Sequence, residues 1–173
     1  TAEKDGEFVD TARRLEETHG LKFKVLGGGN SANIPLLLEK REAAGINNLR
    51  LGESILLGLE TVDRSPVPGT SQEAFRIEAE LIEVKKKPSV PDGRISQNAF
   101  GETPKFEDEG RIWRAIAALG RQDTRVEGLS PLASGLEIIG SSSDHLVLKC
   151  AGDDFKVGDR VEFLPDYGAL LAA

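Results

Sequence analysis

Three consecutive glycines followed by an asparagine and a serine are the first feature that could do chemistry. They occupy residues 27–31 (GGGNS), between a predicted short strand at 23–26 and a predicted helix at 34–44. Glycines let the backbone approach an anion closely, and free N–H groups at the start of a helix favour phosphate. Asn30 closes the run and Ser31 adds a hydroxyl donor, so the residues predict a phosphate site, with a flexible turn as the alternative. No GKS or GKT follows, which excludes a P-loop.

Arg50 is the second candidate, because it stands in the run 49–52 (LRLG) that predicts the end of a buried parallel strand. A buried charge needs a partner, so the guanidinium is expected to meet an anion or a ring acceptor. The residues alone favour a different partner, namely an internal ion pair with Glu53 or Glu60.

A polar turn at 120–123 (GRQD) closes the apolar run 115–119. Arg121 and Asp123 stand at the mouth of a core strand, where polar groups can face a site. A surface turn held by an Arg–Asp pair is the interpretation that the residues favour when they are taken alone.

A serine-rich run at 141–145 (SSSDH) contains Ser143 and Asp144. Adjacent Ser, Asp and His side chains do not make a catalytic triad, because such groups must converge in space. A turn between two strands is the simpler interpretation. The two histidines are far apart and the chain has a single cysteine, so no metal site is predicted.

The elements that position these residues change in type along the chain. Helical spacing at 7–15 is followed by strand, glycine run, helix and a strand at 49–58, which predicts a β–α–β unit with a right-handed crossover. A proline-rich linker at 64–69 then precedes alternating apolar and polar residues, typical of strands. The predicted strands cover residues 75–84, 113–119, 136–139, 145–150 and 160–164. The prediction is an α/β part at 1–63 and a small β-barrel or sandwich at 65–173.

Composition excludes several classes of protein. Hydrophobic residues make up 39% and charged residues 29% of 173 residues, which is typical of a globular chain. The net charge of −7 argues against a nucleic-acid partner. No apolar run is long enough for a membrane helix, and no signal peptide is visible. The single Cys150 in an apolar run predicts a reduced thiol and a cytoplasmic protein.

The two ends predict a truncated chain. The chain begins at Thr1 and contains no methionine. The apolar residues 170–173 (LLAA) are expected to be a buried strand cut at its end.

Three segments together resemble one family, namely the fold-type III racemases related to alanine racemase, and most closely the ornithine or broad-specificity type. They are 28–35 (GGNSANIP), 45–58 (GINNLRLGESILLG) and 156–161 (KVGDRV). The resemblance implies the last β–α–β portion of a (β/α)8 barrel followed by a C-terminal β domain. It also implies pyridoxal 5′-phosphate as cofactor and a homodimer with composite active sites.

The resemblance implies a role for each matching cofactor residue. Ser31, in the segment that begins with Asn30, would bind the cofactor phosphate, and the backbone N–H groups of Gly52 and Glu53 would complete the cradle. Arg50 would face the pyridine nitrogen. A guanidinium stays charged and cannot protonate the ring, so the ring is a weaker electron sink. Quick reprotonation of the α-carbon would follow, which suits racemisation.

The family also needs a proton carrier on each face of the α-carbon. One is the lysine that anchors the cofactor, which the resemblance places upstream of Thr1, so the chain alone is expected to be inactive. The other is a tyrosine in the alanine enzymes, and Arg121 stands at its position here. The only tyrosine is Tyr167.

The departure at Arg121 favours a substrate other than alanine, namely a cationic amino acid such as ornithine or lysine, or a broad range. Arg121 would bind the substrate carboxylate and Asp123 the cationic tail. Ser143 and Asp144 match the family's methionine–aspartate pair near that carboxylate.

Two other functions remain open. One is another fold-type III enzyme, a D-threonine aldolase, a D-serine dehydratase or a decarboxylase; Arg50 argues against decarboxylases, which usually place a carboxylate at the ring nitrogen. The other is a non-catalytic carrier of the cofactor or an isolated β interaction domain.

Overall fold

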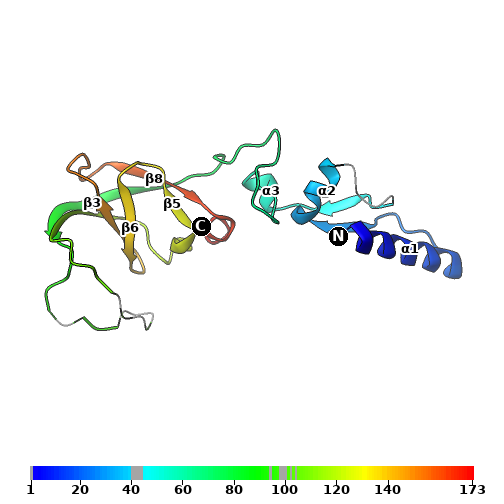
Figure 1. Ribbon diagram of the computed structural model, residues 1–173, viewed down its shortest axis with the longest axis horizontal. Helices are drawn as coiled ribbons and strands as arrows, with labels where there is room; N and C mark the ends of the chain where they lie inside the picture. Colours follow the sequence, from blue (N-terminus) through cyan, green and yellow to red (C-terminus); the bar gives the residue numbers. More distant parts are fainter. Residues whose placement is uncertain (1, 40–44, 94, 98–100, 102, 104) are drawn as a thin grey trace. The chain divides into compact units, whose positions relative to one another are not determined.

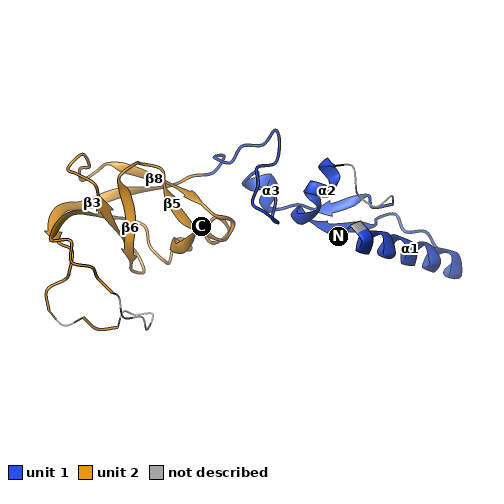
Figure 2. Ribbon diagram, in the orientation of Figure 1, with its two compact units in different colours: residues 1–75 blue, residues 76–173 orange. Residues whose placement is uncertain are grey.

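The chain forms two compact units in a computed structural model, unit 1 (Thr1–Phe75) and unit 2 (Arg76–Ala173), drawn in Figures 1 and 2. The structure describes residues 2–39, 45–93, 95–97, 101, 103 and 105–173. Each unit has its own elements and its own packing.

Unit 1 contains a short parallel sheet with helices. In chain order its elements are α1 (Ala2–His19), β1 (Gly27–Asn30), the 3-10 helix η1 (Ser31–Asn33), α2 (Ile34–Leu38), β2 (Asn48–Arg50) and α3 (Glu53–Leu56). β1 and β2 pair in parallel, with Gly27 opposite Asn48 and Asn30 opposite Arg50. A parallel pair connected through a helix is the β–α–β arrangement that the sequence predicts.

The first strand lies in the glycine run itself, so the strand predicted at 23–26 is wrong. The Asn47 side chain accepts the Leu26 N–H at 2.8 Å and donates to the Lys24 carbonyl at 3.0 Å. These backbone groups are therefore satisfied without a strand partner. A Cβ on Gly28 would lie 2.4 Å from Ile46 Cγ2, so the glycine lets Ile46, just before β2, pack closely on β1.

The helices of unit 1 also correct the prediction. α2 begins at Ile34 as expected and ends at Leu38, and residues 40–44 of the predicted helix lie outside the described residues. The strand predicted to continue over 53–58 is wrong, because α3 forms there. The Gly52 carbonyl accepts the N–H groups of Ile55 and Leu56 at 3.0 and 3.1 Å.

The proline-containing segment 64–69 belongs to unit 1 and contacts the residues just before it. Leu59 forms a bridge with Pro66. The buried Glu60 carboxylate accepts three backbone N–H groups, those of Val62, Asp63 and Ser65, at 2.6, 2.8 and 3.0 Å. These bonds, that of Ser65 first, lower the pKa of Glu60. The segment is therefore a hydrogen-bonded loop.

Unit 2 is an antiparallel β domain. Its elements are β3 (Ile77–Pro88), β4 (Arg111–Ala117), η2 (Val126–Gly128), β5 (Leu129–Pro131), β6 (Leu136–Ser141), β7 (Leu146–Cys150), β8 (Arg160–Pro165) and α4 (Tyr167–Ala172). The strand order is β5-β8-β3-β4-β7-β6. β3 pairs with β8 through its first residues and with β4 through the rest, and the outer strands β5 and β6 contact each other. The sheet is therefore a nearly closed small barrel, and the predicted class is confirmed.

The barrel interior contains the core of unit 2. The largest fully buried side chains are Leu81, Leu146, Leu148 and Phe163. Cys150 is buried beside them, and burial raises the pKa of its thiol. A raised pKa keeps this thiol protonated and less reactive.

The last residues of the chain form α4, so the strand predicted at 170–173 is wrong. Asp166 caps this helix by accepting the Ala169 N–H at 2.7 Å. Arg125 pairs with the same carboxylate at 2.5 Å. Burial opposes ionisation, but these two partners lower the pKa of Asp166.

The ion pairs of Glu83 in β3 predict how the stability of the β domain depends on pH. Strand alternation places Glu83 on one face with Lys85 and Lys87, both of which it contacts. The hydrogen bonds of Lys85 and then Lys87 lower the pKa of Glu83 from 4.5 to about 2. Because the folded-state pKa is depressed, this stabilisation is present above about pH 4.5 and is lost as the pH falls through about 2.

We therefore expect Glu83→Gln to lower the thermal midpoint at pH 7 and to match the unmodified chain near pH 2. Thermal unfolding followed by circular dichroism across this range measures both. Asp92→Asn, at an exposed turn residue, is the matched control. A difference between Glu83→Gln and the unmodified chain that persisted at the acid end would contradict the ion-pair account.

Candidate functional site

Two buried hydroxyl groups face each other where β1 and β2 end. Ser31 directly follows β1, and Ser54 lies in α3, shortly after β2. Their Oγ atoms are 3.1 Å apart, and the two residues are 3% and 2% exposed. The carboxyl ends of neighbouring parallel strands meet at one edge of a sheet, which is where α/β proteins bind their ligands. The predicted site residue Ser31 therefore has a hydrogen-bond partner, Ser54, that was not predicted from the sequence.

Gly52 and Glu53 begin α3 beside this pair. No side chain caps the helix at Gly52, and the first N–H groups of a helix have no acceptor within the helix itself. The buried Glu53 carboxylate contacts Arg64, a non-glycine residue with a φ of 61°. An ionised carboxylate has no proton to donate, so Glu53 can offer only its backbone N–H to an anion.

Asn30 shapes the turn that follows β1. Its side chain accepts the Ala32 N–H at 3.0 Å, which caps η1 just after the strand. Asn33 donates to the Gly28 carbonyl and, at 3.3 Å, to Asp5 of α1. These two amides hold the backbone on either side of Ser31 in place.

Arg50 is the exposed last residue of β2, so its predicted burial is wrong. The predicted ion pair with Glu53 or Glu60 is also absent among the described residues, since Glu53 pairs with Arg64 and Glu60 accepts backbone N–H groups. The Arg50 Nη1 atom lies 3.6 Å from where a Cβ on Gly27 would stand. The guanidinium therefore lies beside β1, within ordinary van der Waals distance of a side chain at position 27.

The two polar turns of unit 2 lie against each other. The N–H groups of Arg121 and Gln122 donate to the carbonyls of Ser142 and Ser143 at 3.0 and 2.8 Å. A Cβ on Gly120 would lie 2.4 Å from the Ser143 carbonyl oxygen and the Asp144 nitrogen. The structure thus brings Arg121, Asp123, Ser143 and Asp144 into one cluster, the turn pair (residues 120–123 and 141–145).

Side chains of the turn pair are held by neighbours. Arg121 donates to Ser141 Oγ and contacts Glu127, both at 2.9 Å. Asp123 accepts the Gly120 N–H at 2.8 Å, which closes the first turn. Arg121 is therefore held by Ser141 and Glu127, and the Asp123 carboxylate closes the turn in which both residues lie.

Asp144 is the acidic centre of the second turn. Its Oδ1 accepts the hydroxyls of Ser142 and Ser143 at 3.0 and 3.2 Å and lies 3.0 Å from His145 Nδ1. The hydrogen bond from the Ser142 hydroxyl lowers the pKa of Asp144 most. Burial opposes it, and the charge of His145 and the Ser143 hydroxyl lower the pKa further. Asp144 therefore presents an ionised carboxylate at neutral pH.

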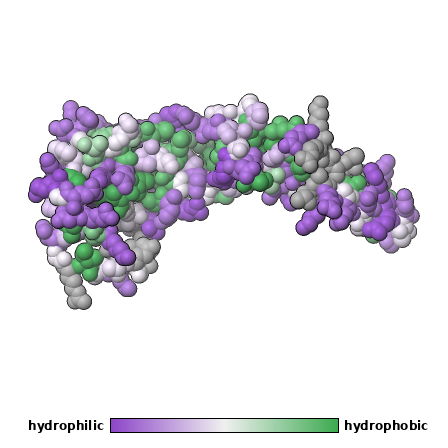
Figure 3. Space-filling model, in the orientation of Figure 1, coloured by the Kyte–Doolittle hydropathy of each residue, from purple (hydrophilic) through white to green (hydrophobic). Residues whose placement is uncertain are grey.

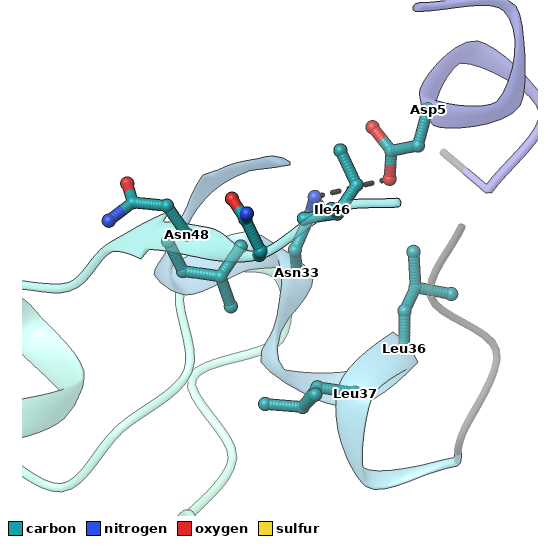
Figure 4. A pocket seen from close by; sticks show the side chains of 8 residues that line it. Asp5, Asn33, Leu36, Leu37, Ile46 and Asn48 are labelled. Carbon is teal, nitrogen blue, oxygen red and sulfur yellow. Dashed lines mark hydrogen bonds between the residues drawn. The ribbon is translucent and has the colours of Figure 1, made fainter. Parts of the chain in front are cut away.

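A separate pocket of about 280 Å³ lies in unit 1 between α1, α2 and β2. Figure 4 shows Leu36, Leu37 and Ile46 along its wall, with a hydrogen bond from Asn33 to Asp5. Neither Ser31 nor Ser54 lines it. Its lining also contains Asp5, and a carboxylate there disfavours an anionic group such as a phosphate.

Exposed apolar side chains also mark unit 1. Ile55 on α3 is 70% exposed, and Figure 3 shows apolar side chains at the surface around this helix. In the part of the chain that the structure describes, no helix is long and apolar enough to cross a membrane. No group of three His, Cys, Asp or Glu side chains in the same residues could hold a metal ion.

Proteins of known structure share this fold. D-threonine aldolase from Filomicrobium marinum matches 99% of this chain and 41% of its own, with a TM-score of 0.61 and 16% identity. Alanine racemase from Bartonella henselae, solved with covalently bound pyridoxal phosphate, matches 98% of this chain and 47% of its own, with a TM-score of 0.55 and 17% identity. The chain therefore has the fold of the part of these two proteins that it matches.

Sequence comparison narrows the class. The chain is 42% identical to ornithine racemase of Acetoanaerobium sticklandii over 166 residues, which are 95% of this chain and 47% of that protein. It is 42% identical to lysine racemase of Thermotoga maritima over 174 aligned positions, covering 100% of this chain and 49% of that protein. The chain spans about half the length of these curated relatives, and no protein-family model matches it. It is related to the amino-acid racemases, which confirms the resemblance inferred from its sequence.

Proposed function

We propose that this chain forms the phosphate seat and the β domain of a pyridoxal-phosphate-dependent racemase of free amino acids. The observation that carries the proposal is the buried Ser31–Ser54 hydroxyl pair at the ends of two parallel strands. Its support comes from the relationship to ornithine and lysine racemases along the whole chain. The exposed Arg50 at the same strand ends fits the same site.

The residues at the strand ends fit the cofactor. Pyridoxal phosphate, when bound, withdraws electrons from the α-carbon of the amino acid so that its proton becomes acidic. Ser31 would donate its hydroxyl to the phosphate, and Gly52 and Glu53 would donate backbone N–H groups. Arg50 would face the ring nitrogen with a guanidinium that stays charged and has no proton to transfer at neutral pH.

The turn pair would select the substrate. Arg121 offers a fixed cation for the substrate carboxylate. Glu127 contacts Arg121, and the turn pair itself contains two more carboxylates, those of Asp123 and Asp144. An acidic surrounding favours an amino acid with a cationic side chain over alanine. Ornithine and lysine, the substrates named for the two relatives, have this chemistry.

Racemisation needs a proton carrier on each face of the α-carbon. Arg121 is a poor base because its guanidinium remains protonated. Tyr167, at the start of α4, is the only tyrosine of the chain. The lysine that anchors the cofactor has no match among these residues, so we expect no turnover from the 173-residue chain alone. The proposed assembly is a homodimer in which unit 2 of one subunit completes the site of the other.

Arg121→Ala in the full-length enzyme tests the role of the turn pair. Losing a charge-assisted hydrogen bond to the substrate carboxylate should lower kcat/KM by about 10- to 100-fold. Steady-state racemisation of ornithine measures the loss. Gln122→Ala, an exposed neighbour in the same turn, should stay within about twofold. A kcat/KM near the wild-type value in Arg121→Ala would contradict the proposed role of Arg121 in substrate binding.

D-threonine aldol cleavage is the second candidate, because an aldolase is among the proteins that share the fold. Both reactions begin with the same activated α-carbon, and they differ in the bond that breaks. Release of glycine and acetaldehyde from D-threonine by the full-length protein would favour this candidate over a racemase.

A further inference from the structure

The hydroxyl of Ser54 has no part in the cofactor roles assigned above, yet it is one of the most deeply buried polar groups of unit 1. It comes from a different strand end than Ser31, 23 residues further along the chain, and meets it at 3.1 Å. A buried serine costs free energy unless its hydroxyl is hydrogen-bonded. Ser31 is the partner that the structure gives it.

Hydroxyl chemistry fixes the direction of this hydrogen bond once an anion is present. Each hydroxyl has one proton to donate and lone pairs to accept with. A phosphate oxygen can only accept, so Ser31 must donate its single proton to it. The Ser31 oxygen can then meet Ser54 only as an acceptor, and Ser54 must be the donor.

We infer that Ser54 is a positioning residue for the phosphate seat, donating to Ser31 so that the Ser31 proton points to the phosphate. Hydrogen bonds in such a chain polarise one another, so the donor Ser54 also strengthens the bond that Ser31 makes. Without Ser54 the Ser31 hydroxyl is free to rotate toward a local backbone carbonyl instead. This inference rests on the proposed function, because it requires that Ser31 binds a phosphate.

The test uses the full-length protein freed of cofactor and titrated with pyridoxal phosphate and, separately, with pyridoxal, which has no phosphate. Binding is read by the change in visible absorption, and each Kd is compared among wild type, Ser31→Ala, Ser54→Ala and the double variant. Ser31→Ala should weaken pyridoxal phosphate binding by about 10- to 100-fold and Ser54→Ala by about 3- to 10-fold. Neither change should alter the Kd of pyridoxal by more than about twofold.

A residue that acts only through Ser31 has no effect once Ser31 is gone. The double variant should therefore bind pyridoxal phosphate as weakly as Ser31→Ala alone. Ser54→Cys fills the space of the serine but is a weak hydrogen-bond donor. It should weaken pyridoxal phosphate binding as much as Ser54→Ala does, which would exclude a cavity as the cause of the loss. Losses that multiply in the double variant, or that affect pyridoxal equally, would overturn the positioning role.

The outcomes separate this inference from the proposed function. If Ser31→Ala weakens binding and Ser54→Ala does not, the role of Ser54 is wrong and the proposed function stands. If wild type shows no preference for pyridoxal phosphate over pyridoxal, both are wrong.

Discussion

Replacing Gly120 by alanine is expected to abolish most of the activity of the full-length enzyme. The new Cβ would lie 2.4 Å from backbone atoms of Ser143 and Asp144, and backbone cannot move aside as a flexible side chain can. The two halves of the turn pair must then separate, which breaks the hydrogen bonds from Arg121 and Gln122 to the facing turn. A displacement of about 1 Å in a substrate-positioning group can lower the rate by about 100-fold.

Racemisation kinetics and the thermal midpoint together measure the Gly120→Ala effect, which should also destabilise the β domain by about 1–3 kcal/mol. Gly140→Ala is the matched control. Its Cβ would approach only Val147 Cβ, at an ordinary 3.9 Å. Equal activity of the two variants would mean that the contact between the turns does not position Arg121.

Phe163→Ala is expected to have the largest effect on stability. Phe163 of β8 is fully buried in the barrel and is the largest of its fully buried side chains. Truncation removes a ring that the nearly closed sheet cannot easily refill, at a cost of about 3–5 kcal/mol in free energy of unfolding. Such a loss is comparable to the whole stability of a small domain.

Trp113 makes this prediction measurable in the 173-residue chain, because it is the only tryptophan and packs against the core of unit 2. Its fluorescence during denaturant unfolding reports on that unit. Phe106→Ala, at a residue 39% exposed in the β3–β4 connection, should change the free energy of unfolding by no more than about 0.5 kcal/mol. A loss below about 1 kcal/mol for Phe163→Ala would contradict the barrel core described above.

The β domain could be predicted from the sequence because its signal is local. Alternating residues from Phe75 to Val84 place every second side chain inward, and turns containing Gly and Asp separate the later strands. α4 escaped prediction because Leu170 and Leu171 suggest a strand by composition, whereas the Asp166 cap decides for a helix. β5 is only three residues long and carries no periodicity.

Unit 1 was predicted less well because its signals conflict. A run of glycines is typical of a loop, whereas here it pairs with β2, and Ile46 packs closely on Gly28. The apolar spacing in 53–58 fits a strand or a helix, and the Gly52 carbonyl decides for a helix by accepting two N–H groups.

The candidate site shows the limit of sequence reasoning more clearly. Ser31, Arg50 and Gly52 could be proposed from local chemistry and a family resemblance. Ser54 could not, because a serine between a glutamate and an isoleucine carries no pattern of its own, and its importance arises only where two strand ends meet. The contact between the turns at Arg121 and Ser142 likewise depends on strand pairing that residue order does not reveal.

The central claim is that the protein racemises a free amino acid with a cationic side chain. The most direct measurement incubates the full-length protein and pyridoxal phosphate with L-ornithine, L-lysine, L-alanine and D-threonine and separates the products by chiral chromatography. We expect D-ornithine or D-lysine to form until the two enantiomers are present in nearly equal amounts, and alanine to be converted much more slowly. Unchanged ornithine and lysine, with cleavage of D-threonine or no reaction at all, would contradict it.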